Sequence, residues 1–338
     1  MGGGVGFAGS SVLRIGVVTA FPSEDWHSAR LIAAVGEQGA KAVVIDPATF
    51  ALDLNGQGLD VTTGAKSVMD LDALLLARGL SPRGDGDLQF EAYHQLVGLG
   101  QPQVNCIGAL LTAQDKLRAS CLFARAGVPT PETRMVQTEH EALAALADLR
   151  WAVVKPRFGS LGNGMVRLRA DSRGRAHLRG LLEKEGGLYL QRFVATGGED
   201  YRVFVVAGRA VAAVRRRARG REWRTNLAQG GMAKAFEPPI RLARTAVAAA
   251  RAVGLAYTAV DVVATSRGYF VLEVNGHPNF EMAWESCRVD VGERIVAHVL
   301  QRARGWRRRF ERAARGKKPQ GSLGRDNRRS GWAAAPVA

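Results

Sequence analysis

The chain has 338 residues, 46% of them hydrophobic, and carries a formal net charge of +16 at pH 7. This length suits two or three domains or one large composite domain, and the hydrophobic content is that of a globular protein. No apolar run is long enough for a transmembrane helix, and the three cysteines, Cys106, Cys121 and Cys287, lack metal-site spacing and are odd in number. We therefore expect a cytoplasmic protein that has no membrane partner and no disulfide framework.

Strand and helix patterns alternate over the first hundred residues. Apolar runs typical of buried strands occupy 13–20, 41–47 and 72–80, and apolar residues at helical spacing occupy 28–40 and 88–100. This alternation predicts a parallel sheet with helices packed on it, which we assign to an N-terminal α/β domain over residues 11–108. Residues 1–10 are glycine-rich and uncharged, and we expect a flexible leader there. No glycine-rich dinucleotide fingerprint follows the first strand.

The pattern changes from residue 112 onward. Residues 112–127 predict one helix, with Thr112 as its N-cap and Gly127 as its stop, and the proline-containing residues 128–133 then interrupt regular structure. The segments that follow are a strand ending at Lys155, strand-like runs at 188–194 and 200–218, a helix at 241–253, and a strand pair at 258–264 and 269–275.

Two polar residues interrupt the last of these strand patterns. Glu273 and Asn275 are two positions apart, so in a strand their side chains would lie on the same face. Asp261 lies in the preceding strand pattern, and the short turn between the strands allows it to face Glu273. Two buried carboxylates repel each other unless a cation neutralises them, and carboxylate and amide oxygens suit Mg²⁺. The residues predict either a magnesium site or a strand end whose polar side chains face water.

A glycine-rich loop follows Lys155. Glycines at 159, 162 and 164 would let backbone amides approach an anion, and the lysine would add a positive charge. The loop lacks the P-loop pattern, and most glycine-rich turns only reverse the chain. Three arginines can either clamp phosphates or form ordinary surface charge: Arg202, Arg216 and Arg224.

The positive charge is concentrated near the C-terminus. Residues 301–338 hold 12 Lys and Arg residues and two acids, which is +10 of the net +16. The stretch starts like a helix end and then becomes rich in Gly, Ser and Arg, so we expect a basic tail over 304–338 that is disordered beyond about residue 315. Such a tail can bind nucleic acid or an acidic partner, or it can be a solvated arm.

At this point the sequence resembles the RimK-like ATP-grasp ligases. The resemblance runs from about residue 110 to about residue 300, in matching order and spacing, through DKLRASCLFARAGVPTPET, VVKPRFGSLGNGMV, YLQRFV, GEDYRVFVVAGRAVAAVRRRA, REWRTNLAQGG, AVDVV and LEVNGHPNF. It implies an α/β chain in which the N-terminal domain is followed by a two-lobed α+β ATP-grasp domain. We divide that domain into a small lid subdomain over 109–190 and a core subdomain over 191–303.

The resemblance also implies roles for individual residues. Lys116 and Lys155 match phosphate-binding lysines, and Asp200 matches a ribose-binding acid. The lid loop would contain Gly159, Ser160, Gly162 and Gly164; the adenine hinge would be Gln191, Arg192, Phe193 and Val194, with Arg202 also near the nucleotide. The residues implied near the γ-phosphate and the acceptor are Arg216, Arg224 and Asn226. The implied metal ligands are Asp261, Glu273 and Asn275.

The implied activity is ATP-dependent ligation of a carboxylate to an amine through an acylphosphate, with two magnesium ions, for which manganese is a possible substitute. The amine would be an amino acid such as glutamate, and the carboxylate would belong to a protein tail, a peptide or a cofactor, in a homo-oligomeric enzyme. The sequence departs from the family pattern in two places. Arg192 replaces an acid common in the hinge, so we expect the adenine contacts to come from the backbone and Gln191. The GHPNFEMAW segment, which begins at Gly276, replaces the family's usual motif beside the acceptor pocket and leaves the acceptor open. The alternative is a non-catalytic protein of this fold that binds nucleic acid or an acidic partner through the basic tail.

Overall fold

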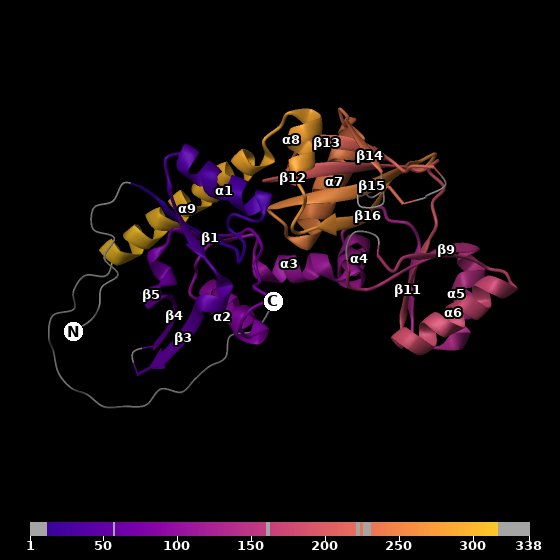
Figure 1. Cartoon of the computed structure of the whole chain (residues 1–338), viewed down its shortest axis with the longest axis horizontal. Coiled ribbons are helices and arrows are strands. Elements are labelled where there is room, and N and C mark those ends of the chain that lie inside the picture. The colour runs from indigo at the N-terminus through magenta and orange to yellow at the C-terminus, as the bar shows by residue number, and fades with distance from the viewer. Residues whose placement is uncertain (1–11, 57, 160–162, 221–223, 226–230, 317–338) are drawn as a thin grey trace.

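The N-terminal part of the chain is a parallel sheet with helices on both faces. The computed structural model describes residues 12–56, 58–159, 163–220, 224–225 and 231–316 (Figure 1). Its first sheet has the order β2-β1-β6-β7, with all neighbours parallel. The strands are β1 (Arg14–Val18), β2 (Lys41–Ile45), β6 (Ala73–Leu76) and β7 (Gln103–Val104), and the helices are α1 (Trp26–Glu37) and α2 (Gly86–Gly98). The predicted parallel α/β arrangement is confirmed.

A small antiparallel sheet lies within this part of the chain and was not expected. It has the order β3-β4-β5, formed by β3 (Phe50–Asn55), β4 (Gly58–Thr63) and β5 (Lys66–Ser67), with short 3-10 helices at Pro47–Thr49 and Val68–Asp70. Its alternation of buried and exposed residues is weak: Phe50 and Val61 are buried, whereas Leu54 is 79% exposed. A pattern with so few buried residues gives little signal in the sequence.

Two helices, not one, connect the first sheet to the rest of the molecule. Helix α3 (Ile107–Gln114) ends before Asp115, and α4 (Lys116–Arg125) begins after it, so the prediction of one helix over 112–127 is wrong. Asp115 has extended backbone angles, and its carboxylate accepts hydrogen bonds from the amides of Leu117 and Arg118 at 3.0 and 3.2 Å. Thr112 is not an N-cap, because its hydroxyl donates to the carbonyl of Gly108 inside α3.

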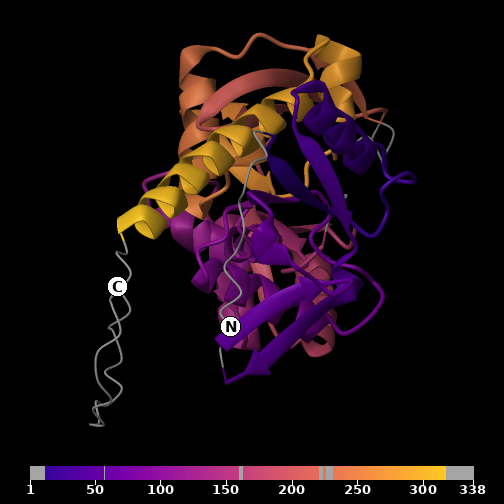
Figure 2. The same cartoon turned by 90° about the vertical axis from the view of Figure 1, so that its left-hand side faces the viewer.

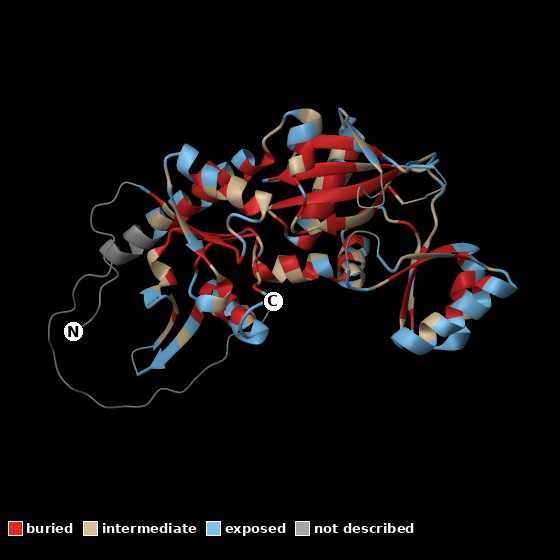
Figure 3. Cartoon of the chain, viewed as in Figure 1, coloured by how far each residue is buried: buried red, intermediate tan, exposed pale blue. Residues whose placement is uncertain are grey.

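The segment from 133 to 192, called the lid below after the lid subdomain expected over 109–190, is a subdomain with its own hydrophobic core. Its sheet has the order β10-β9-β11-β8 and is covered by two helices. The elements are β8 (Thr133–Val136), α5 (Glu139–Leu149), β9 (Trp151–Lys155), β10 (Val166–Arg169), α6 (Ser172–Glu185) and β11 (Leu188–Arg192). Leu146, Leu178 and Leu190 are fully buried within it, while the outer sides of α5 and α6 are exposed (Figure 3).

The central sheet is antiparallel and has the order β14-β13-β12-β15-β16. It contains β12 (Glu199–Val206), β13 (Arg209–Arg217), β14 (Met232–Ala235), β15 (Tyr257–Thr265) and β16 (Gly268–Asn275), with helices α7 (Ile240–Val253), α8 (Glu281–Cys287) and α9 (Val291–Gly316). The strand-like run at 200–218 is therefore a hairpin, β12 and β13. Helices α3 and α4 pack against this sheet and α7, whereas the lid lies beyond them (Figure 1).

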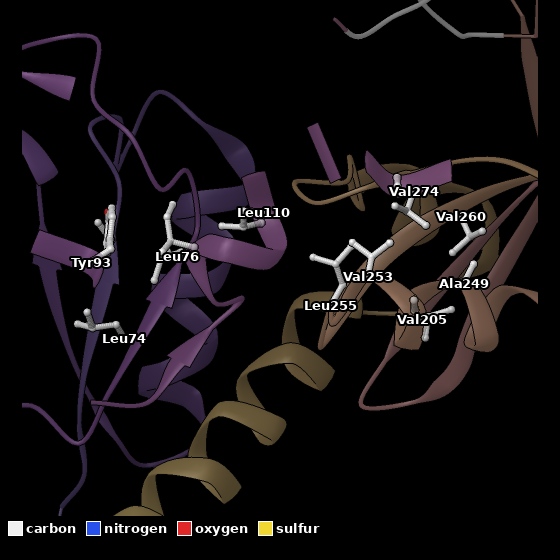
Figure 4. Close-up of a cluster of buried hydrophobic side chains, with 14 of the residues drawn as sticks. Leu74, Leu76, Tyr93, Leu110, Val205, Ala249, Val253, Leu255, Val260 and Val274 are labelled. Atoms are coloured by element: carbon white, nitrogen blue, oxygen red, sulfur yellow. The ribbon is translucent and has the colours of Figure 1, made fainter. Parts of the chain in front are cut away.

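The two halves of the base share their hydrophobic cores. One cluster begins on the first sheet with Leu74 and Leu76, continues through Leu110 of α3, and reaches Val205 and Val260 of the central sheet (Figure 4). A second cluster joins the opposite face of the first sheet to α9 and to the other face of the central sheet. The first sheet and the central sheet therefore form one continuously packed base, from which the lid projects.

Helix α9, at the C-terminal end of the described chain, packs against the first sheet. It crosses the sheet beside α1 (Figure 2), and Ala303 and Trp306 are buried. Arg307 donates two hydrogen bonds to the fully buried carboxylate of Asp72, at 2.7 and 2.5 Å. The helix continues past residue 303 to Gly316. The expected leader at 1–10 and the disorder expected beyond residue 315, except for Gly316 itself, lie outside the described residues.

None of the helices in the described ranges is long and apolar enough to cross a membrane.

We expect Arg307→Met to lower the free energy of unfolding by about 2–4 kcal/mol, because Asp72 would remain buried without its cationic partner. Urea unfolding followed by circular dichroism measures the change. Arg308→Met is the matched control, because Arg308 is exposed on the same helix. Equal unfolding midpoints for the two variants would show that the pair does not stabilise the attachment of α9.

Candidate active site

Strand register places a row of charged side chains on one end of the central sheet. Arg202 of β12 pairs with Asp261 of β15, which pairs with Glu273 of β16. Directly opposed residues share a face, so these three side chains are neighbours. Asp200 and Arg216 are paired across β12 and β13 two residues further along, and therefore lie on the same face. The other end of this face is apolar and belongs to the shared core.

Two arginines and two aspartates of this row form a buried ion network. Arg202 donates to both oxygens of Asp261, at 2.7 and 2.8 Å. Arg216 donates to both oxygens of Asp200, at 2.8 and 2.6 Å, and its Nη2 lies 2.9 Å from Asp261. Thr225 adds a hydrogen bond to Asp200. Each arginine thus makes a bidentate pair, the geometry that a planar guanidinium provides and an ammonium does not.

The network shifts the pKa values of Asp261 and Arg216 in the direction that favours their charged forms, in spite of burial. Burial alone would raise the pKa of Asp261, but the positive charges of Arg202 and Arg216 outweigh it and hold this pKa below its usual range. Burial would likewise lower the pKa of Arg216, but the opposing effect of Asp261 and Asp200 raises it. From the sequence, Arg202, Arg216 and Arg224 could be either phosphate clamps or ordinary surface charge. In the structure Arg202 and Arg216 are buried and pair with Asp261 and Asp200.

Glu273 differs from the other two acids of the row. It is half-buried, and no described residue forms a hydrogen bond or an ion pair with its carboxylate. Asn275 lies on the same face, and its Oδ1 accepts a hydrogen bond from the amide of His277 at 3.1 Å. The described residues contain no cluster of three His, Cys, Asp or Glu side chains arranged to hold a metal ion. Oxygen donors from Glu273, Asn275 and the already paired Asp261 nevertheless fit the chemistry of Mg²⁺.

Lys155 is a buried cation without a carboxylate partner at hydrogen-bond distance. Its Nζ donates to Oε1 of Gln191 at 2.7 Å, and Gln191 in turn donates to Thr133. Burial lowers the pKa of Lys155 to about 8, and the nearby charge of Glu273 offsets only part of that effect. A cation held this way, in a partly desolvated site, is suited to an anionic ligand.

The row, Lys155 and the hinge surround a cavity of about 460 Å³, here called the first cavity. Most of the predicted site residues line it: Lys116, Lys155, Gly159, Gln191, Arg192, Phe193, Val194, Asp200, Arg216, Arg224, Asp261 and Glu273. Gly164 does not line it, and Ser160, Gly162 and Asn226 lie outside the described residues. The sequence interpretation missed its apolar walls, which include Val153, Met165, Val263 and Leu272. Such residues are indistinguishable in sequence from ordinary strand interior.

The start of the glycine-rich loop is attached to the break between α3 and α4. Arg157 donates to both oxygens of Asp115, at 3.0 and 2.6 Å, and its carbonyl accepts from the amide of Lys116. The Nζ of Lys116 donates to the carbonyl of Gly159 at 2.7 Å. Asp115 therefore caps α4 and also fixes the strand end from which the loop departs. A sequence pattern shows the cap but not the partner 42 positions away.

A second cavity, of about 620 Å³, adjoins the first, because the two have lining residues in common. Lys116, Gly159, Arg216, Leu272 and Glu273 line both cavities, and we call these residues the shared wall. Arg202 and Asn275, the remaining predicted residues of this region, line only the second cavity. Two ligands could therefore meet across one set of charged groups.

Comparison with known proteins identifies this arrangement. Residues 113–299 match the model of the RimK-like ATP-grasp domain, which is more than half of the chain. The chain belongs to the RimK-like ATP-grasp family. ATP-grasp ligases use ATP and magnesium, and the fold class expected from the resemblance is confirmed.

The chain of this RimK-like ligase covers nearly the whole length of its curated relatives. The tetrahydromethanopterin:alpha-L-glutamate ligase of Methanosarcina acetivorans is 30% identical over 85% of this chain and 98% of the relative. A probable alpha-L-glutamate ligase of Xanthomonas axonopodis pv. citri is 33% identical over 83% and 96%. Among solved structures, the ATP-grasp ligase PsnB with its minimal precursor has a TM-score of 0.68 at 20% identity, covering 86% of this chain and 99% of PsnB.

We expect the RimK-like ligase to bind ADP about tenfold more weakly at pH 9 than at pH 7, because Lys155, with its pKa lowered to about 8, loses its proton over this range. Calorimetric titration with ADP and magnesium measures the affinity without turnover. Lys155→Met should bind weakly at both pH values. Wild-type affinity in Lys155→Met at pH 7 would show that Lys155 does not face the phosphates.

We expect Asp115→Asn to raise the KM for ATP several-fold while lowering the free energy of unfolding by less than about 1 kcal/mol, because asparagine caps helices about as well as aspartate but cannot form the ion pair with Arg157. Steady-state kinetics and thermal melting separate the two effects. Arg157→Gln should raise the KM similarly, and the double variant should add little. Additive effects would contradict a role for the pair in holding the loop.

Proposed function

We propose that the protein is an ATP-dependent carboxylate–amine ligase that forms ADP and joins an amino acid such as glutamate to a carboxylate of a protein tail, a peptide or a cofactor. The relatives named as glutamate ligases support the amino acid, and the PsnB complexes support a peptide as one kind of substrate. The observation that supports the proposal is the shared wall, whose residues line both cavities. It would allow the terminal phosphate of ATP in the first cavity to contact a substrate carboxylate in the second, beside the charged side chains of Lys116, Arg216 and Glu273.

The chemistry follows from that contact. A carboxylate oxygen attacks the γ-phosphorus of ATP, the bond to the β,γ-bridging oxygen breaks, and ADP leaves. The amine nitrogen then attacks the acyl carbon, phosphate departs with the bonding electron pair, and the nitrogen loses a proton. Phosphoryl transfer needs alignment and neutralisation of charge rather than a protein nucleophile.

The residues of the first cavity take the following roles in this proposal. Lys116 and Lys155 hold the phosphates, and the loop that begins at Gly159 covers them. The backbone of the hinge, Gln191 to Val194, binds adenine, because the side chain of Gln191 is already bonded to Lys155 and Thr133. The side chain of Arg192 donates to Glu132 and to the carbonyl of Leu149. In this proposal the adenine base is therefore bound by the backbone of the hinge and not by the Arg192 side chain.

The charged row orients the reacting groups. Asp200 accepts a hydrogen bond from the ribose while Arg216 holds it in place, and Arg202 fixes Asp261. Arg224, which lines the first cavity, and Asn226 assist near the γ-phosphate. Rigid partners of this kind keep the groups oriented before the nucleotide arrives.

Glu273, Asn275 and Asp261 would hold magnesium, as two ions for which manganese can substitute. The unpartnered carboxylate of Glu273 is the observation that supports this assignment. When bound, magnesium supplies positive charge to the phosphate oxygens. Asp261 can contribute through lone pairs that its hydrogen bonds to Arg202 and Arg216 leave unused.

We also propose a cytoplasmic, homo-oligomeric enzyme. The three cysteines are unpaired thiols, which suits a reducing compartment. The alternative, a non-catalytic protein that binds nucleic acid or an acidic partner, depends on residues 304–338. The presence of Lys116, Lys155 and Glu273 around the two cavities favours catalysis over a purely binding role.

We expect Glu273→Gln to lower turnover at least about a hundredfold and to raise the magnesium concentration needed for half-maximal activity, because one negative charge of the metal site is lost. Magnesium titration of ADP release, with L-glutamate and peptides ending in a free carboxylate as substrates, tests this. Melting with a chelator controls for folding and should change little. Equal magnesium dependence in both proteins would contradict the assignment of Glu273 as a metal ligand. ADP release that does not require a carboxylate substrate would contradict the proposed ligase activity.

A further inference from the structure

A chain of hydrogen-bonded side chains joins the two cavities. It begins at Lys155 and Gln191, which line the first cavity and not the second. It passes through Tyr189, which lines neither cavity, and ends at Ser120, which lines only the second. Lys155, Gln191 and Tyr189 are 7%, 3% and 2% exposed, so water does not replace the bonds between them. The mechanism proposed above gives no role to Tyr189 or Ser120.

The chain has a direction, because its first member can only donate. The Nζ of Lys155 donates to Oε1 of Gln191 at 2.7 Å, and an ammonium group has no lone pair with which to accept. The oxygen of Gln191 is therefore the accepting end of its amide, and the amide nitrogen points the other way. That nitrogen donates to the hydroxyl oxygens of Thr133, at 3.1 Å, and Tyr189, at 3.3 Å.

The phenol of Tyr189 transmits this direction to Ser120. It accepts from Gln191, so its own hydrogen is left for its second partner, the Ser120 hydroxyl at 2.8 Å. Burial raises the pKa of Tyr189, so the phenol keeps this hydrogen at neutral pH. The nearby Thr133 hydroxyl is already engaged with Gln191 and with the carbonyl of Pro131. The oxygen of Ser120 thus accepts from Tyr189, and the hydrogen of Ser120 remains for another partner.

Ser120 does not use its hydrogen in the way open to a serine inside a helix. Serine and threonine can donate to the carbonyl four residues earlier, as Thr112 does to Gly108 in α3 at 2.8 Å. Among the described residues, no carbonyl accepts a hydrogen bond from Ser120, whose partner is the Tyr189 hydroxyl. Ser120 is half-buried and lines the second cavity, so a ligand in that cavity can supply the acceptor.

Helix α4 carries this hydroxyl close to the shared wall. Four of its residues that line the second cavity recur at a spacing of three and four positions and therefore form one face of the helix: Lys116, Ala119, Ser120 and Phe123. Lys116 belongs to the shared wall and precedes Ser120 by one helical turn. An acid whose carboxylate contacts the shared wall would therefore have that group, or an oxygen a few bonds from it, beside Ser120.

We propose that Ser120 donates a hydrogen bond to an oxygen of the acid bound in the second cavity, and that Tyr189 and Gln191 are positioning residues that fix the direction of this bond. The inference rests on the proposed ligase activity. It assigns to the substrate an acceptor oxygen, in the carboxylate or in a neighbouring carbonyl group, that faces α4. A hydroxyl already held by a buried partner loses little freedom when the acid binds, so it favours one orientation of the acid.

Two acids of similar size serve as probes: pentanoate, whose only oxygens are in the carboxylate, and 4-oxopentanoate, which adds one carbonyl oxygen. Saturation-transfer NMR at saturating ADP and magnesium measures their dissociation constants without turnover. We expect Ser120→Ala to weaken the binding of 4-oxopentanoate about tenfold, because one hydrogen bond is lost. An equal loss for pentanoate places the bond at the carboxylate, and a loss for 4-oxopentanoate alone places it at the carbonyl.

Conservative and control variants accompany this measurement. Ser120→Thr keeps the hydroxyl and should keep most of the affinity. Cys121→Ala should bind both acids as the wild type does, because Cys121 is exposed on the same helix and lines neither cavity. Thermal melting controls for folding. Unchanged affinity for both acids in Ser120→Ala, or no binding of either acid to the wild type, overturns the inference.

Gln191→Glu tests the direction of the chain. A carboxylate can only accept, so Tyr189 would turn its hydrogen toward it, Ser120 would donate to Tyr189, and the cavity would lose its donor. Removing the Ser120 hydroxyl from this variant should then cause no further loss of affinity for 4-oxopentanoate. Tyr189→Phe, which frees the Ser120 hydroxyl to rotate, should bind about threefold more weakly than the wild type. A full tenfold loss on adding Ser120→Ala to Gln191→Glu overturns the proposed direction.

Turnover separates this inference from the ligase activity itself. ATP phosphorylates the acid and releases ADP; hydroxylamine nitrogen then attacks the acyl carbon, phosphate leaves, and a hydroxamate forms. Ser120→Ala should raise the KM for 4-oxopentanoate about tenfold and leave the KM for ATP unchanged, because Ser120 does not line the first cavity. A raised KM for ATP with an unchanged KM for the acid overturns the inference. Absence of ADP release in the wild type, together with acid binding that depends on Ser120, would instead count against the proposed ligase activity.

Discussion

The buried network of Asp200, Arg202, Arg216 and Asp261 is the interaction on which the candidate site depends. Two carboxylates and two guanidiniums on neighbouring strands pair with one another through hydrogen bonds, which allows these polar side chains to lie together with almost no solvent contact. Removing one member would leave an uncompensated buried charge. Lys155 and Glu273 lie beside this network, and among the described residues neither has an oppositely charged partner at hydrogen-bond distance.

The arrangement of cores explains how this network stays in place. The first sheet, the central sheet and α9 share two hydrophobic clusters, so the charged row lies on a continuously packed base. The central sheet is apolar on the part of its face that touches the first sheet and polar on the part that faces the cavities. Residues of the same parity share a face along the whole strand, so this division comes from a change of residue type along that face. On β12 it changes from Asp200 and Arg202 to Phe204 and Val206.

The sequence was informative where periodicity or spacing carried the signal. Glu273, Asn275 and Asp261 were recognised as one group because strand geometry places alternate residues together, and the register bears this out. The partners of Asp261 could not be foreseen, since Arg202 is 59 positions away and its pairing depends on the order of strands in the sheet. The same reason hid the bond from Arg157 to Asp115, whose capping side chain also divides a segment that reads as one helix. The apolar walls of the first cavity gave no signal, because ligand-facing and core-facing valines are alike in sequence.

The separate core of the lid has a consequence for the energetics of the molecule. Leu146, Leu178 and Leu190 pack only among residues of the lid's own cluster, so this segment is a cooperative unit whose amide hydrogens can exchange through local opening while the base remains folded. A nucleotide in the first cavity would touch Val153 and Met165 of the lid side as well as Leu272 of the base. Its binding free energy would then be added to the free energy of that opening, and the protection of the lid would report the occupancy of the site.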